Sequence, residues 1–145
     1  MRTILLFVLA ATAVVGADGS KPDSIKDEIK KFAGTWKLVS ASMDGVDQMP
    51  EQVKTGSLVV ESDKFTLKIG NEIHKGKFVI DPTTKPKTID VEFTEGSLKD
   101  SKVLGVYQID GNKRKSCFAE PTMDRPADLA AGKGRYLWTW QADKP

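Results

Sequence analysis

The chain has 145 residues, which is enough for one domain with a single hydrophobic core and too short for two. Its 22 Lys and Arg residues nearly balance its 20 Asp and Glu residues, and this argues against a general attraction to nucleic acid or to an anionic membrane. One Cys and one His cannot form an intramolecular disulfide or a Cys/His metal cluster, so we expect neither a metal nor a cofactor.

Residues 1–17 have the pattern of a removable export signal. Arg2 supplies the positive charge, and an apolar run from Ile4 to Val15 is too short to span a bilayer. Small residues at Gly16 and Ala17 then offer a cleavage site. The pattern predicts a secreted or periplasmic protein that is free of the membrane after cleavage, and an N-terminal membrane anchor is the alternative.

Residues 18–33 are expected to form an N-terminal segment with one short helix, and residues 34–145 to form the main domain. Ile25, Ile29 and Phe32 recur at helical spacing. They predict an amphipathic helix over Ser24–Phe32, which ends at Gly34. After this helix the hydrophobic period changes from about 3.6 residues to about 2, which is typical of β-strands.

Eight β-strands are predicted in the main domain. Apolar and polar residues alternate along them, as in Phe65, Leu67 and Ile69, so one face is dry and the other solvated. The strands are Thr35–Ala41, Ser57–Glu61, Lys64–Ile69, Glu72–Ile80, Thr88–Thr94, Lys102–Ile109, Lys113–Ala119 and Arg135–Gln141. Their short sequential connections favour an all-β, up-and-down antiparallel barrel of eight strands, with the N-terminal helix closing one end.

The order of the connections predicts which end of the barrel is open. The helix enters the first strand at the end that it can seal. The two longest loops, Ser42–Gly56 and Glu120–Gly134, lie at the opposite end, and loops on a rigid scaffold often carry binding residues. Pro50–Thr55 in the first of these loops can form one helical turn.

Aromatic side chains crowd the predicted inward face, while Gly76 and Gly105 leave some room, so we expect a small pocket near the rim rather than a deep one. The candidate ligand-binding residues are Ser40, Met49, His74, Phe93, Phe118, Arg125 and Tyr136. Ser40, His74 and Tyr136 can orient a polar head group while apolar residues hold the body of the ligand. Alternatively, these three side chains bond one another or water at the barrel mouth.

Two residues of the seventh predicted strand have open roles. Arg114 is predicted to face inward at the helix-closed end, where it either stacks on Trp36 or extends out of the barrel end. Cys117 is expected to be a half-buried strand residue, and a reactive or intermolecular thiol is the alternative.

The sequence contains no catalytic constellation to which roles can be assigned. His74 is the only His, and neither a Gly-x-Ser-x-Gly motif nor a phosphate-binding loop occurs. Carboxylate pairs such as Asp90 and Glu92 lie on the solvated face. We therefore expect that the protein is not an enzyme.

Several segments resemble known families. Gly34-Thr35-Trp36 after a short helix is similar to the Gly-x-Trp motif that opens the barrel of lipocalins. The segments GTWKLVSA, DKFTL, DPTTKPKTIDVEFTEG, VLGVYQIDGN and CFAEP…DRP resemble a lipocalin-like domain family found in secreted planctomycete proteins. This resemblance implies a calycin-like barrel and carries no established biochemical activity.

The same resemblance places Arg125-Pro126 in the loop of the rim, where Arg125 either faces the cup or pairs with Asp124 or Asp128. The sequence thus predicts a secreted, non-enzymatic, lipocalin-like barrel that binds a small, largely apolar ligand at its open rim. The alternative is a filled barrel that acts as an extracytoplasmic protein-interaction or structural module.

Overall fold

The computed structural model describes residues 22–143 of the chain. The predicted export signal at residues 1–17 lies outside this range. Two helices are described, α1 (Pro22–Phe32) and α2 (Pro50–Val53), and neither has the length and the apolar character that crossing a membrane requires. The strands are β1 (Gly34–Met43), β2 (Val46–Asp47), β3 (Ser57–Glu61), β4 (Lys64–Ile69), β5 (Glu72–Asp81), β6 (Lys87–Glu95), β7 (Lys102–Asp110), β8 (Lys113–Ala119) and β9 (Arg135–Ala142).

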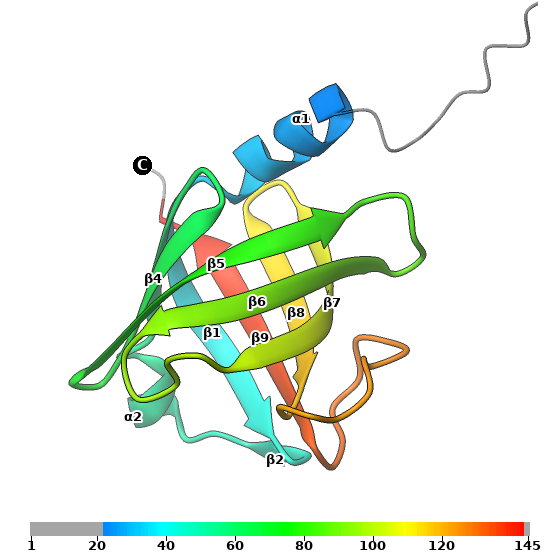
Figure 1. The fold of residues 1–145 in the computed structure, drawn as a ribbon. Helices are drawn as coiled ribbons and strands as arrows, with labels where there is room; N and C mark the ends of the chain where they lie inside the picture. The colour runs from blue at the N-terminus through cyan, green and yellow to red at the C-terminus, as the bar shows by residue number, and fades with distance from the viewer. Residues whose placement is uncertain (1–21, 144–145) are drawn as a thin grey trace, which may run out of the picture.

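The strands form a closed antiparallel barrel, as predicted. Strands β1 and β3 to β9 pair in chain order, and β9 pairs back onto β1, which closes a barrel of eight strands. The two-residue β2 lies beside the end of β1 and was not predicted. Helix α1 lies across one end of the barrel, whereas α2, β2 and the loop of residues 120–134 lie at the other (Figure 1).

The inward face follows the predicted alternation except in β1. The pairing of β1 with β9 shifts its register between Leu38 and Ser40, which is the sign of a β-bulge. A bulge reverses the side-chain alternation that follows it, so Ser40 is exposed and Met43 lies on the inward side instead. The prediction that Ser40 faces the interior is therefore wrong.

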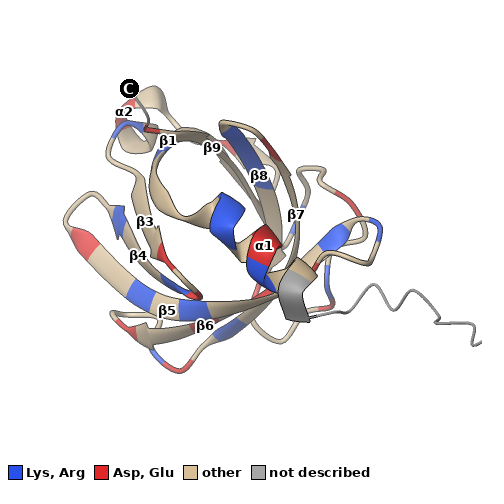
Figure 2. Cartoon of the chain, turned by 90° about the horizontal axis from the view of Figure 1, so that it is seen from above, with Lys and Arg blue, Asp and Glu red and all other residues tan. Residues whose placement is uncertain are grey.

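The end of the barrel under α1 is filled by aromatic side chains. Phe32 is fully buried, and its ring centroid lies 5.4 Å from that of Phe78 and 5.0 Å from that of Tyr107. Nε1 of Trp36 donates a hydrogen bond of 2.7 Å to the carbonyl oxygen of Phe32. Viewed along the barrel, α1 crosses over this end (Figure 2), so the closed end is sealed by packing and by a buried hydrogen bond.

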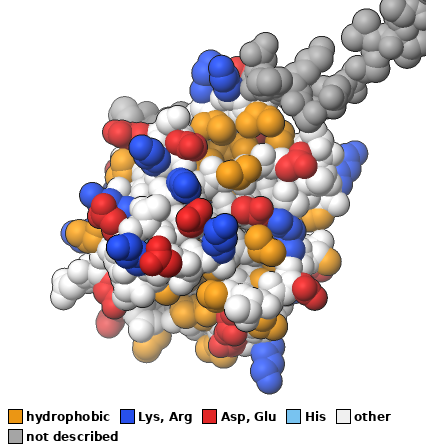
Figure 3. All heavy atoms as spheres, in the orientation of Figure 1, with side chains coloured by type: hydrophobic (Ala, Val, Ile, Leu, Met, Phe, Trp, Pro, Cys, Tyr) orange, Lys and Arg blue, Asp and Glu red, His pale blue; other side chains and the backbone are white. Residues whose placement is uncertain are grey.

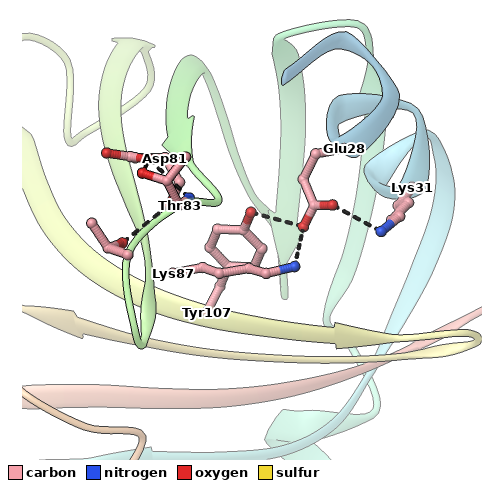
Figure 4. A network of polar contacts seen from close by, with 7 residues as sticks. Glu28, Lys31, Asp81, Thr83, Lys87 and Tyr107 are labelled. Carbon is pink, nitrogen blue, oxygen red and sulfur yellow. Dashed lines mark hydrogen bonds and ion pairs between the residues drawn. The ribbon is translucent and has the colours of Figure 1, made fainter. Parts of the chain in front are cut away.

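A buried carboxylate ties α1 to two strands (Figure 4). Oε1 of Glu28 accepts hydrogen bonds from Lys87 at 2.8 Å and from the Tyr107 hydroxyl at 3.0 Å, and Oε2 accepts one from Lys31 at 2.8 Å. Burial raises the pKa of the Glu28 carboxyl, but these three hydrogen bonds outweigh it and hold the pKa below its usual value. Burial, together with the charge of Glu28, raises the pKa of Tyr107.

The loop of residues 120–134 covers part of the outer wall of the barrel. Val106 and Cys117 point outward from β7 and β8, yet both are buried, and Sγ of Cys117 lies 3.7 Å from the carbonyl oxygen of Ala130. Cys117 was predicted to be half-buried, and the loop buries it completely.

The surface charge is mixed on the face of the molecule that Figure 3 shows. Basic and acidic side chains are interspersed on this face, and no large region of it has one sign of charge.

Candidate functional site

The barrel contains a cavity of about 400 Å³. Met43, Leu98 and Tyr136 line it at the open rim, and Arg114 and Trp140 line it near the closed end. The cavity therefore runs along most of the barrel, and the prediction of a pocket confined to the rim is wrong.

Two pairs of an aromatic residue and a glycine explain the depth of the cavity. Gly76 lies opposite Phe65, and Gly105 lies opposite Phe118, on neighbouring strands. A Cβ atom at Gly105 would lie 2.5 Å from Cδ1 of Phe118, and one at Gly76 would lie 2.7 Å from Cζ of Phe65. Each ring thus packs against the glycine of the neighbouring strand, and both rings form part of the cavity wall.

Four of the predicted site residues line the rim half of this cavity: His74, Phe93, Phe118 and Tyr136. The rings of His74 and Phe93 meet edge to face, with their centroids 6.1 Å apart. Nε2 of His74 lies 3.3 Å from a carboxylate oxygen of Glu72, while its buried Nδ1 has no hydrogen-bond partner within the described part of the chain. Burial raises the pKa of the Tyr136 phenol, as do the nearby carboxylates of Glu120 and Asp44.

Arg114 is the charged residue in the deep half of the cavity. It faces inward with only 6% of its surface exposed, and the central carbon of its guanidinium lies 4.6 Å from the ring centroid of Phe32. The prediction that it faces inward is confirmed, but it neither stacks on Trp36 nor extends out of the barrel. Nε and Nη1 of Arg114 have no hydrogen-bond partner among residues 22–143. Burial lowers the pKa of Arg114 to about 10, so the guanidinium stays charged at neutral pH.

One further polar residue, Ser116, and two indoles lie next to Arg114. In the pairing of β8 with β9, Arg114 lies opposite Trp140, and Ser116 lies opposite Trp138. The four side chains share the inward face and all line the cavity. Oγ of Ser116 and Nε1 of Trp138 are buried, and neither has a hydrogen-bond partner in the described structure. We call Arg114, Ser116 and Trp138 the polar floor of the cavity.

Three predicted site residues do not reach the cavity. Ser40 points outward after the bulge. Met49 is 66% exposed and does not line the cavity, whereas Val53 of the same loop packs into the core. Arg125 lies on the outer wall, where its Nη1 donates a hydrogen bond of 2.8 Å to the carbonyl oxygen of Gly105 and lies 2.6 Å from a carboxylate oxygen of Asp90.

Neither alternative for Arg125 is therefore correct. It does not face the cup, and it does not pair with Asp124 or Asp128. Asp128 instead pairs with Arg135, at 2.9 Å. The loop of residues 120–134 folds back over the outside of β6 and β7, and this places Arg125 over the solvated face of the sheet.

Sequence reasoning missed the polar floor as a binding feature, although it placed Arg114 on the inward face. The available signal was an Arg and a Ser at two of the three inward positions of Lys113–Ala119. Met43 gave no such signal, because the bulge that turns it inward depends on the pairing with β9.

Within residues 22–143, no group of three or more His, Cys, Asp or Glu side chains is placed to hold a metal ion. No protein-family model, no curated protein and no solved structure shows a significant match to this chain. The arrangement of the site thus has to be interpreted from its own geometry. That geometry is a deep, mostly apolar cavity with hydrogen-bond donors at its closed end and one His near its rim.

Proposed function

We propose that the protein binds a small, largely apolar molecule inside its barrel and does not transform it. The observation that carries this proposal is the cavity of about 400 Å³, which is open at one end and lined mainly by aromatic and aliphatic side chains. Small-molecule sites in proteins have this size and composition, with a few polar groups that orient the ligand.

The packing of the barrel supports binding over a purely structural role. Side chains that line an internal space lack packing partners on one side, which costs stability. A barrel that acts only as a scaffold gains stability if larger side chains fill its internal space. The two glycines instead hold Phe65 and Phe118 against the wall and keep the space open.

The placement of the polar groups supports binding without catalysis. A serine nucleophile needs a base within hydrogen-bond distance. Ser116 and His74 lie on strands that are not neighbours, and Oγ of Ser116 and Nδ1 of His74 make no hydrogen bond to each other or to any other described residue. We assign these groups to ligand orientation.

The proposed setting is outside the cytoplasm, and the proposed family is the lipocalin-like group of secreted planctomycete proteins. The support for the setting is the signal-like pattern of residues 1–17, and the support for the family is the set of segments quoted above. The closed barrel with a helix over one end is compatible with both proposals.

Native mass spectrometry of the protein purified from its own host tests the proposal. We expect a small molecule to be retained. Because Trp138 and Trp140 line the cavity, added apolar ligands are also expected to change tryptophan fluorescence. An empty protein whose fluorescence responds to no member of a panel of apolar ligands contradicts the proposal.

A pair of variants locates the binding to the cavity. Tyr136→Ala removes a half-buried side chain from the cavity mouth, so we expect the affinity to fall by about tenfold while thermal stability changes little. Ser40→Ala is the matched control, because Ser40 is exposed on the outer wall. Equal affinities of the wild type and Tyr136→Ala for the ligand show that Tyr136 is not part of the site.

A further inference from the structure

We infer that the ligand is an amphipathic monocarboxylate, with its carboxylate bound to Arg114 at the closed end and its apolar chain extending to the rim. This inference rests on the proposed function, since it names the class of molecule that the same cavity takes.

The guanidinium of Arg114 is buried without a counter-ion. No Asp or Glu side chain within the described residues forms an ion pair with it, and the ring of Phe32 lies against its face. A buried charge is costly unless an opposite charge or several hydrogen bonds compensate it. A ligand anion at this position supplies both.

The free atoms of Arg114 match the geometry of a carboxylate. Nε and Nη1 belong to the planar, forked end of the side chain, and both have no hydrogen-bond partner in the described part of the protein. In a guanidinium, the two parallel N–H donors that bind the two oxygens of a carboxylate come from Nε and Nη2 or from Nη1 and Nη2, so either pair includes one of these free atoms. Because the polar floor contains a single cationic side chain, it balances one negative charge.

The two neighbours of Arg114 add donors one inward-facing position nearer to the rim. Ser116 lies two residues further along β8 on the same face, and Trp138 lies opposite Ser116 on β9. The indole Nε1 can only donate a hydrogen bond, and the serine hydroxyl can donate one. Both atoms are buried and have no partner within residues 22–143, so the polar floor fits a group that accepts hydrogen bonds.

The rest of the cavity fits an apolar chain. Four residues of extended strand separate Arg114 from Phe118 near the rim, which corresponds to about 13 Å. Leu67, Val91 and Val103 line the wall between the two ends. A straight alkyl chain anchored at Arg114 therefore lies along the cavity toward the mouth.

The experiment compares dodecanoate with dodecanol, which have chains of equal length and differ in the charge of the head group. Isothermal titration calorimetry on the wild type at neutral pH is expected to show dodecanoate binding about tenfold or more tightly. Arg114→Met is expected to lower the affinity for dodecanoate by about tenfold to a hundredfold and to leave the affinity for dodecanol nearly unchanged. Lys115→Met is the matched control, because it removes one positive charge from the exposed face of the same strand.

The outcomes separate this inference from the proposed function. If the two compounds bind the wild type equally well and Arg114→Met changes neither affinity, the carboxylate assignment is wrong and the proposed function stands. If neither compound binds and no ligand of the apolar panel changes the tryptophan fluorescence, both proposals fail.

A spectroscopic measurement on the wild type does not depend on the folding of a variant. The Nε–H proton signal of Arg114 in the nuclear magnetic resonance spectrum is expected to shift when dodecanoate is added, and to stay in place when dodecanol is added. An unchanged signal at saturating dodecanoate contradicts the inference.

Discussion

The guanidinium of Arg114 lies over the ring of Phe32, with its central carbon 4.6 Å from the ring centroid. Phe32 is the last residue of α1, and Arg114 lies at the start of β8, so this contact links the closing helix to the floor of the cavity. A cation over an aromatic face contributes about 0.5 to 2 kcal/mol, with the larger values at buried sites. The helix thus seals one end of the barrel and also holds the proposed head-group site.

Replacing Phe32 tests this link. We expect Phe32→Ala to lower the free energy of unfolding by about 3 to 5 kcal/mol, because it opens a void at a fully buried position. Phe32→Leu keeps an apolar side chain there and removes only the aromatic contacts, so its loss should be smaller. Urea denaturation of both variants measures these losses, and an unchanged stability of Phe32→Ala shows that the helix does not hold the closed end.

Removing the charge of Glu28 is expected to make stability less dependent on pH. Burial alone raises the pKa of Glu28, but hydrogen bonds from Lys31, Lys87 and Tyr107 bring it below its unfolded value of 4.5. The folded carboxyl therefore contributes its full stability above about pH 4.5, and loses it as the pH falls through the lowered pKa. Above that range Glu28→Gln should cost about 1 to 3 kcal/mol, and the difference should shrink in more acidic solution.

Urea denaturation at several pH values measures this effect. Asp27→Asn is the control on the same helix, because Asp27 pairs with Lys30 at 3.6 Å while both side chains are largely exposed. We expect that variant to follow the wild type at every pH. A constant difference between Glu28→Gln and the wild type across the acidic range contradicts the role of the Glu28 charge.

A methyl group at Gly105 is expected to affect stability and binding together. Its Cβ atom would lie 2.5 Å from Cδ1 of Phe118 and 2.7 Å from the carbonyl oxygen of Cys117, so the ring must move toward the cavity. Gly105→Ala should cost about 1 to 3 kcal/mol in thermal or urea unfolding, and should weaken the binding of dodecanoate. Gly132→Ala is a suitable control, because its Cβ atom meets only Cδ of Arg135, at an ordinary 3.6 Å.

The thiol of Cys117 reports on the loop of residues 120–134. Burial raises the pKa of Cys117, so we expect a thiol reagent to label it slowly in the native protein and rapidly in denaturant. Arg125→Ala removes the hydrogen bonds that hold the loop to the carbonyl oxygens of Ile89 and Gly105, so native labelling should become faster. Asp124→Ala, at an exposed position of the same loop, is the control, and equal rates in all three proteins contradict this role of Arg125.

Local patterns in the sequence were sufficient to predict the barrel. The alternation of Phe65, Leu67 and Ile69 and the helical spacing of Ile29 and Phe32 depend only on nearby residues, and the structure contains both elements. These features together define the strand order and the closed end.

The features that were missed depend on residues far apart in the chain. The bulge that turns Ser40 outward arises where β1 meets β9, and the partners of Arg125 belong to β6 and β7. Phe32 packs against Arg114, but most of the strands of the barrel lie between these two residues in the sequence. The depth of the cavity likewise comes from rings that lie over glycines of neighbouring strands, which a single strand pattern does not reveal.

The bulge in β1 has a consequence for how selective the barrel is. It brings the unbranched, flexible thioether of Met43 to the mouth, where a side chain of this kind adapts to the shape of whatever lies against it. At the opposite end, the planar guanidinium of Arg114 packs against the ring of Phe32. We therefore expect the proposed site to discriminate sharply between head groups and to accept tails of varied length and branching.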